Sequence, residues 1–169
     1  MLQVDLRELA LGPVETTGEL AQDDPLLAGL EVALAEPVRV GGRLQATGEE
    51  RFYWHGTLDT RVAGECRRCL TVVSQAVHAD VGALFVRGAD AADDPDAFAL
   101  GEDATLVDVT PAVREELFLV APRYVLCRED CRGLCPRCGI DLNAGPCGCG
   151  PTPDPRWTAL AALKDKLRG

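Results

Sequence analysis

This sequence of 169 residues lacks the features that identify common enzymes and membrane proteins. It contains no P-loop, no GxGxxG, no GxSxG and no HExxH, so no motif indicates nucleotide binding, serine-hydrolase or zinc-protease chemistry. No apolar run reaches the length of a membrane span. The first residues carry neither the basic region nor the apolar core of a signal peptide. We therefore expect a cytoplasmic protein that is not an enzyme, with no membrane and no small-molecule substrate among its partners.

Basic residues are scarce as well. The chain has 17 Lys and Arg residues against 27 Asp and Glu residues, which gives a formal net charge of −10. Such a balance argues against a protein that grips long nucleic acid by bulk neutralisation of phosphates, although it leaves room for a local basic patch. Hydrophobic residues make up 47% of the sequence, enough for a folded core. The length fits one domain, or one domain with a small metal-held appendage.

Histidines and aromatic residues are few. The two histidines, His55 and His78, each stand alone in strand-like surroundings, where an ordinary position in a sheet is a better interpretation than a metal ligand. The aromatic cluster Phe52-Tyr53-Trp54 would place its first and third rings on one face of a strand and Tyr53 on the other. Cross-strand packing is the usual role of such a cluster, and base stacking is the rarer one.

Short strands dominate the region from Leu30 to Val86. Its period-2 stretches are rich in Val, Leu, Thr and aromatic residues. Gly41-Gly42 is predicted to form a two-residue hairpin turn, and Gly48-Glu49-Glu50 is predicted to form another. Cys66 and Cys69 would lie at a tight connection between two strands. These close turns favour an antiparallel sheet.

Different patterns follow the strands. Residues 88–105 hold six acidic residues and no basic one, which favours a solvated loop over an acidic segment that engages a basic partner. A helix is predicted over residues 108–121, with Pro111 in its first turn and Pro122 ending it. A last amphipathic helix is predicted to begin at Asp154.

The fold class predicted from these patterns is α+β. We expect a twisted or partly closed antiparallel sheet with a few helices and a zinc-stapled C-terminal segment. Residues 1–122 would form a mainly β core that includes the acidic loop and the covering helix. Residues 123–169 would form a cysteine-rich zinc segment and the C-terminal helix.

Cysteine is the residue type in which this chain is rich, with 8 in all. Cys66 and Cys69 form a Cys-x2-Cys pair, and the other six lie within CREDCRGLCPRCGIDLNAGPCGC, residues 127–149. Two separated Cys-x2-Cys pairs in a short chain indicate metal binding, because a two-residue gap lets both thiolates face one ion. Disulfides and a redox dithiol are the alternatives; a reducing cytoplasm disfavours the first, and the absence of a βαβ pattern disfavours the second.

Eight thiols divide into two zinc sites of four. The compact site would use Cys135, Cys138, Cys147 and Cys149. The second would join Cys66 and Cys69 to Cys127 and Cys131, so that the C-terminal region is clamped onto the sheet. A single site with Cys131 in place of Cys147 or Cys149 is the alternative. Four thiolates leave no open position on the ion, so either site would be structural.

Arginines accompany the cysteines and provide a candidate binding surface for RNA or a partner protein. They are Arg67, Arg68, Arg123, Arg128, Arg132 and Arg137. The planar guanidinium suits phosphate and carboxylate groups, since it donates two parallel hydrogen bonds. The alternative is that these arginines offset the negative charge of zinc-bound thiolates.

The chain resembles the YceD-like family of large ribosomal RNA subunit accumulation proteins. The resemblance lies in VDLR (4–7), ECRRCL (65–70), the helix with its REEL (114–117), CRGLCPRCG (131–139), DLN (141–143), the Cys147 and Cys149 pair, and DPRW (154–157). Family members often keep the cysteine pair in the sheet and can lack the C-terminal cysteines. The resemblance thus implies that Cys66 and Cys69 belong to the common core.

The resemblance also implies a function. It points to a non-enzymatic ribosome-biogenesis factor that supports accumulation of large-subunit ribosomal RNA, by binding this RNA or a large-subunit assembly intermediate. The alternative is a zinc-stabilised protein–protein adaptor, whose acidic surface would engage a basic ribosomal protein without touching RNA.

Overall fold

A long antiparallel sheet forms the body of the molecule. The computed structural model describes residues 2–88, 95–150 and 156. The strands are β1 (Gln3–Asp5), β2 (Val14–Leu20), β3 (Ala33–Leu34), β4 (Val38–Gly48), β5 (Arg51–Glu65), β6 (Val72–Arg87), β7 (Phe98–Leu100) and β8 (Leu106–Asp108). The helices are the 3-10 turns η1 (Glu8–Leu11) and η2 (Pro25–Leu27) and the α-helix α1 (Thr110–Val120).

The strands form two sheets. The larger has the order β2-β4-β5-β6-β7, with β3 added alongside β5, and the smaller pairs β1 with β8. All pairings are antiparallel except that of β6 with β7, which is parallel. The described part of the chain is therefore a mostly antiparallel, mixed sheet with one α-helix. That helix is not long and apolar enough to cross a membrane.

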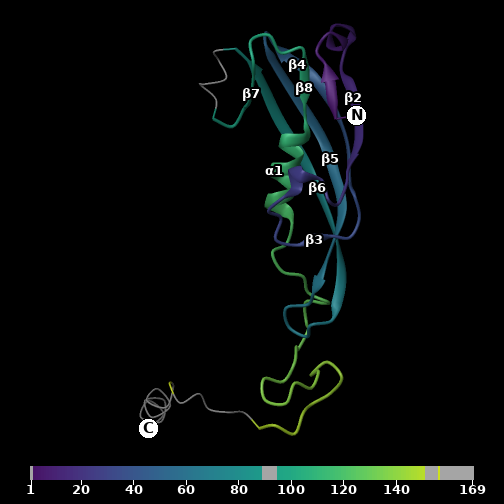
Figure 1. Cartoon of the computed structure of the whole chain (residues 1–169), viewed down its shortest axis with the longest axis vertical. Coiled ribbons are helices and arrows are strands. Elements are labelled where there is room, and N and C mark those ends of the chain that lie inside the picture. The colour runs from purple at the N-terminus through teal and green to yellow at the C-terminus, as the bar shows by residue number, and fades with distance from the viewer. Residues whose placement is uncertain (1, 89–94, 151–155, 157–169) are drawn as a thin grey trace, which may run out of the picture.

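The hairpin of β5 and β6 runs the length of the sheet. Its register continues without a break from Arg51 opposite Val86 to Glu65 opposite Val72. A strand of this length spans about 50 Å at the usual rise per residue. Its far end therefore projects beyond the other strands and carries the β5–β6 connection, which contains Cys66 and Cys69, toward the loops of residues 127–150 in the lower part of the view (Figure 1).

Alternation along β5 decides which face is the core. Phe52, Trp54, Leu58, Thr60 and Val62 are buried, whereas the residues at the alternate positions, from Tyr53 to Arg61, are exposed or half-buried. We call the buried side the inner face and the opposite side the outer face. Helix α1 lies along the inner face (Figure 1), where its residues Val113 and Leu117 join the same core cluster as Trp54.

Gly41 and Gly42 lie in the interior of β4, so the predicted hairpin turn at this pair is wrong. Gly42 faces Gly56 across the strands, and a Cβ built on Gly42 would lie 2.5 Å from the ring of Trp54. Gly42 and Gly56 together leave the space that the indole of Trp54 occupies. Its Nε1 donates a buried hydrogen bond of 2.8 Å to Oγ1 of Thr16 on β2.

The other local predictions have mixed outcomes. The turn at Gly48-Glu49-Glu50 is confirmed, because β4 and β5 pair directly across it from Gly48 to Arg51. Helix α1 ends at Val120, ahead of Pro122 as predicted, and begins at Thr110, whose N–H is capped by the Asp108 carboxylate at 2.9 Å.

The acidic segment 88–105 is not loop throughout. Phe98–Leu100 forms strand β7, since the Phe98 ring stacks on Phe85 with centroids 5.2 Å apart and anchors the segment beside β6. Residues 89–94 lie outside the described residues. So does the C-terminal helix predicted from Asp154, apart from the single residue Arg156.

Gly42→Ala is expected to destabilise the protein by about 1–3 kcal/mol, because its methyl group would overlap the fully buried Trp54 ring. Gly41→Ala is the matched control, since a Cβ there meets no atom within 4 Å. Urea unfolding of both variants measures the difference. Equal losses would show that the indole does not depend on this gap.

Candidate metal centres at the cysteine tip

Two sets of four cysteines converge at the projecting end of the hairpin. We call this region, residues 66–71 with 127–150, the cysteine tip. The first set is Cys66, Cys69, Cys127 and Cys131, and the second is Cys135, Cys138, Cys147 and Cys149; within each set the sulfur atoms all lie within 4.8 Å of one another. The eight thiols are free cysteines. Cys131 lies with the first set. The alternative prediction, a single site in which Cys131 replaces Cys147 or Cys149, is therefore not the arrangement found in the structure.

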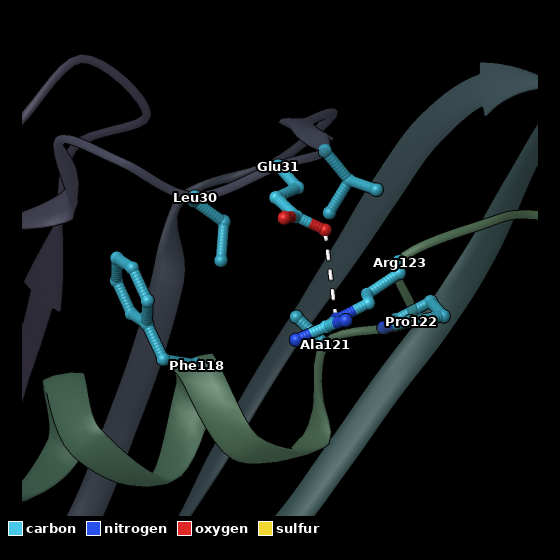
Figure 2. A pocket seen from close by; sticks show the side chains of 7 residues that line it. Leu30, Glu31, Phe118, Ala121, Pro122 and Arg123 are labelled. Atoms are coloured by element: carbon cyan, nitrogen blue, oxygen red, sulfur yellow. Dashed lines mark ion pairs between the residues drawn. The ribbon is translucent and has the colours of Figure 1, made fainter.

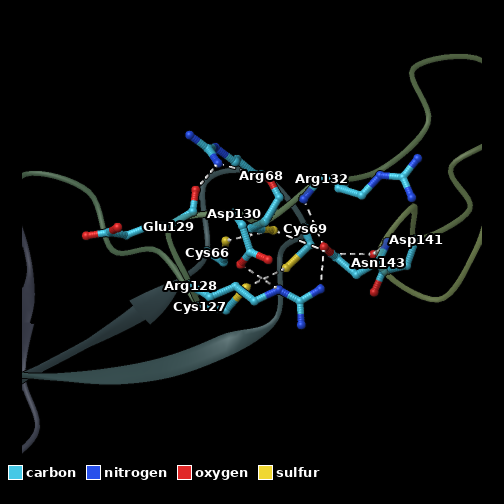
Figure 3. A network of polar contacts seen from close by, with 11 residues as sticks. Cys66, Arg68, Cys69, Cys127, Arg128, Glu129, Asp130, Arg132, Asp141 and Asn143 are labelled. Atoms are coloured by element: carbon cyan, nitrogen blue, oxygen red, sulfur yellow. Dashed lines mark hydrogen bonds and ion pairs between the residues drawn. The ribbon is translucent and has the colours of Figure 1, made fainter.

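The first set joins two distant parts of the chain. Cys66 and Cys69 come from the β5–β6 connection, whereas Cys127 and Cys131 come from the segment after α1 (Figure 3). The Sγ atoms of Cys66 and Cys131 are 3.9 Å apart, and those of Cys69 and Cys127 are 3.6 Å apart.

These distances fit a tetrahedral tetrathiolate centre. Four sulfurs placed 2.3 Å from one ion lie about 3.8 Å from each other. The separations in the first set fall on either side of that value. Three of its four cysteines are also buried. Both sets could therefore hold a metal ion.

The two Cys-x2-Cys loops have the same backbone hydrogen bonds. In the first, the Leu70 N–H donates to the Cys66 carbonyl and the Cys66 N–H donates to the carbonyl of Thr71, both at 2.8 Å. In the second, the Gly139 N–H donates to the Cys135 carbonyl at 2.9 Å, and the Cys135 N–H donates to the Ile140 carbonyl at 2.8 Å. One local fold thus presents a thiol pair at both places.

This loop requires a left-handed residue after its second cysteine. Gly139 has φ 73° and Leu70 has φ 62°. Glycine adopts this conformation freely, whereas a side chain costs about 1–2 kcal/mol there. The hairpin connection therefore keeps its loop geometry in spite of local strain at Leu70.

Backbone N–H groups prepare the leading cysteine of each loop for the thiolate form. The N–H of Cys127, with those of Arg68 and Cys69, lowers the pKa of Cys66 to about 6. The N–H groups of Cys138 and Arg137 likewise lower the pKa of Cys135 to about 6. Both shifts favour the thiolate, which is the form that binds metal.

Further deprotonation is opposed within each set. Hydrogen bonding to Cys131 raises the pKa of Cys127 to about 12, and hydrogen bonding to Cys138 raises the pKa of Cys149 to about 12. Like charges this close repel one another, so a thiolate at one cysteine raises the pKa of its neighbours and keeps them protonated. A divalent cation would remove that penalty, which is the electrostatic reason why these sets suit a metal.

The second set is docked on the first by backbone contacts. The Leu134 N–H donates to the Arg68 carbonyl at 3.0 Å, and the Leu142 N–H donates to the Gly133 carbonyl at 2.9 Å. Gly133 has φ 72°, and a Cβ there would lie 2.8 Å from the Arg68 carbonyl oxygen. The close approach of the segments around Gly133 and Arg68 therefore depends on glycine at position 133.

Asn143 connects the two sets, although it was not among the residues selected from the sequence. It lies between Cys138 and Cys147, yet its Nδ2 donates to the Cys131 sulfur of the first set at 3.4 Å. Its Oδ1 accepts from the Arg132 N–H at 2.8 Å. The pKa of Cys131 is lowered by this amide and by the Gly133 N–H, against the opposing effect of burial. No motif could have revealed this role, because it depends on how the loop folds back.

Two of the six arginines have structural partners within the cysteine tip. Arg68 donates to the carbonyls of Glu129 at 2.7 Å and Cys131 at 2.9 Å. Arg128 lies 3.2 Å from the carboxylate of Asp130 and donates to Oδ1 of Asn143 at 2.9 Å (Figure 3).

Arg123 lies apart from the cysteine sets. It is at the end of α1, 3.6 Å from the Glu31 carboxylate, beside a pocket of about 130 Å³ that Phe118 and Leu30 also line (Figure 2). The expected gathering of six arginines therefore does not include this one.

The remaining three arginines present their guanidinium groups to solvent. Arg67 lies over the exposed ring of Tyr124, with 5.7 Å between its Cζ and the ring centroid. Arg132 and Arg137 line an open groove of about 340 Å³ beside the second cysteine set, together with Pro136 and Pro146. Within the described part of the chain, neither of these two guanidinium groups has an acidic partner.

The fold and the tip define a class: a small β protein that carries two four-cysteine sets able to hold metal. The chain belongs to the YceD family, because the profile described as large ribosomal RNA subunit accumulation protein YceD matches residues 54–164. The match includes β5 from Trp54 onward, β6, α1 and all eight cysteines.

Curated relatives come from mycobacteria. An uncharacterized protein of Mycobacterium tuberculosis (strain ATCC 25618 / H37Rv) is 34% identical over 121 residues, covering 68% of this chain and 58% of the relative. An uncharacterized protein of Mycobacterium leprae (strain TN) is 30% identical over 141 residues, covering 80% and 64%. The chain thus spans about three-fifths of the length of the curated relatives it matches. No solved structure matches it.

Gly133→Ala is expected to lower the free energy of unfolding of the protein by at least about 1 kcal/mol more than Gly139→Ala. Both residues have a left-handed φ and so incur the same strain, but only the methyl group at position 133 meets the Arg68 carbonyl. Denaturant unfolding of the two variants gives this difference directly. If both variants lose the same amount, the docking of the two cysteine loops is not set by this contact.

Proposed function

We propose that this protein is a non-enzymatic ribosome-biogenesis factor that supports accumulation of large-subunit ribosomal RNA by binding that RNA, or an assembly intermediate that contains it, through the cysteine tip. Family membership supports the ribosomal role. The observation that carries the RNA contact is the groove beside the second cysteine set, where the guanidinium groups of Arg132 and Arg137 have no acidic partner among the described residues. A guanidinium binds phosphate with two parallel hydrogen bonds, so these groups suit the RNA backbone.

The proposed metal is zinc, one ion in each cysteine set. Soft thiolate ligands in a tetrahedral arrangement suit this ion, and the sulfur separations of the first set agree with its bond lengths. Zinc bound there would supply folding free energy to a segment that buries little apolar surface. Four thiolates would fill all its coordination positions, which is why we propose a structural role and no catalysis.

The arginines then divide by role. Arg68 and Arg128 hold the tip together through carbonyl, carboxylate and amide partners. Arg132, Arg137 and Arg67 are left to bind a partner. The compact arrangement of these groups on an otherwise acidic protein of net charge −10 favours a short, salt-sensitive contact over extended binding to a duplex.

The full chain is expected to bind two equivalents of Co²⁺, used as a spectroscopic substitute for zinc, with the absorption bands of tetrahedral thiolate coordination. Cys138→Ser with Cys149→Ser should leave one equivalent, held by the first set. The reciprocal pair, Cys69→Ser with Cys127→Ser, should leave the other. A single equivalent in the unmodified chain would contradict the two-site proposal.

Arg132→Glu and Arg137→Glu are each expected to weaken binding of a large-subunit RNA fragment about tenfold. Each should also reduce the slope of log affinity against log salt by about 0.7, because one phosphate contact is lost. Fluorescence anisotropy at several salt concentrations measures both effects. Arg7→Glu is the matched control, since Arg7 is exposed, far along the chain from the tip, and changes the net charge equally.

The adaptor alternative predicts a different result. If RNA affinity is unchanged in both tip variants, and a basic ribosomal protein remains bound to the chain after ribonuclease treatment, then protein binding and not RNA binding is the activity.

A further inference from the structure

The outer face of the sheet carries a group of side chains that the proposed function does not use. Tyr53 and His55 alternate along β5 with the buried core residues, so both point outward. Gln45 lies opposite Tyr53 on β4, and Arg43 lies opposite His55. The four side chains line an open hollow of about 370 Å³.

Two glycines leave space around these side chains. On β4, Gly41 precedes Arg43 by two positions and so shares its face, and on β6, Gly82 lies opposite His55. A Cβ on Gly41 would meet no atom within 4 Å, which shows that the floor of the sheet is open there.

Gly82 also holds the tyrosine in place. A Cβ on Gly82 would lie 2.6 Å from the Tyr53 hydroxyl oxygen and 3.5 Å from its Cζ. The phenol ring therefore leans across the backbone of β6 in a space that any other residue would fill. It nevertheless remains 37% exposed. The result is an aromatic ring held against the sheet and accessible to a flat ligand.

The charge of the hollow suits an anionic ligand with a planar group. Its lining contains one guanidinium and one imidazole and no carboxylate. Glu15 approaches Arg43 at 3.5 Å, but both side chains are more than half exposed, so this ion pair is weak and a phosphate could replace it. Further along the same face, Asp59 is occupied by His78 at 2.8 Å.

We propose that this hollow is a second contact for RNA, at which an unpaired base of a single-stranded segment stacks on Tyr53 and His55. Arg43 would bind the adjoining phosphate, and the Gln45 amide would hydrogen-bond to the base edge. Aromatic side chains on an open sheet bind single strands in this way, because every base offers a π-face. This proposal rests on the RNA-binding function proposed above, and it assigns single-stranded RNA as the ligand class.

The test uses the full, zinc-loaded chain and a fluorescently labelled single-stranded RNA of ten nucleotides. Tyr53→Leu is expected to weaken binding about ten- to a hundredfold, the usual loss for one stacked base. Tyr53→Phe should bind within about twofold of the unmodified chain, since it retains the ring. Gly82→Ala should weaken binding as well, because its methyl group displaces the Tyr53 ring and removes no group that binds RNA.

Thr57→Ala is the matched control, because Thr57 lies on the same face and outside the lining of the hollow. An RNA containing 4-thiouridine, irradiated in the complex, should cross-link to the peptide with Tyr53 and His55. If Tyr53→Leu and Gly82→Ala bind RNA as tightly as the unmodified chain while the Arg132 and Arg137 variants do not, the hollow is not an RNA site and the proposed function stands. If the unmodified chain binds no RNA, both proposals fail together.

Discussion

The crowding of four thiols around one point is the constraint on which the cysteine tip depends. Backbone N–H groups stabilise a thiolate at Cys66 and at Cys135, and each thiolate then opposes ionisation of its neighbours. A protein without a cation would gain nothing from such crowding. The repeated loop geometry and the sulfur spacing therefore give two cysteine sets that could each hold a metal ion, with the Asn143 amide linking one set to the other.

The long hairpin of β5 and β6 positions the cysteine tip at its projecting end. Two strands of this length twist and bend unless one of their faces is packed, and here the indole of Trp54, buried over Gly42 and Gly56, packs the inner face at the centre of the sheet. Core packing thus occurs in the sheet, whereas the tip contributes few apolar side chains of its own. Loss of metal should for this reason loosen the tip and leave the sheet folded.

The proposed RNA contacts share one physical logic in an acidic protein. Bulk attraction to phosphate is absent, so binding has to come from a few guanidinium groups without carboxylate partners and from a ring that is held in position before the ligand arrives. The groove with Arg132 and Arg137 supplies the first, and Tyr53 against Gly82 supplies the second. Under the proposed function, such contacts would give selectivity for unpaired RNA segments and little affinity for duplexes.

Sequence alone determined the features that depend on local chemistry: the alternation that buries Trp54, the turn at Gly48 and the helix that ends before Pro122. It offered two arrangements of the thiols, and the tertiary structure brings them together as two sets of four. Tertiary structure decided whatever depends on distant partners. It showed that Gly41 and Gly42 lie inside a strand and make no turn, that Gly42 and Gly56 leave space for the Trp54 ring, and that Phe98 lies beside β6. It also separated arginines that hold the tip from those that face solvent. A spacing reports which residues can meet, but whether a guanidinium finds a carbonyl or water depends on the chain that folds back against it.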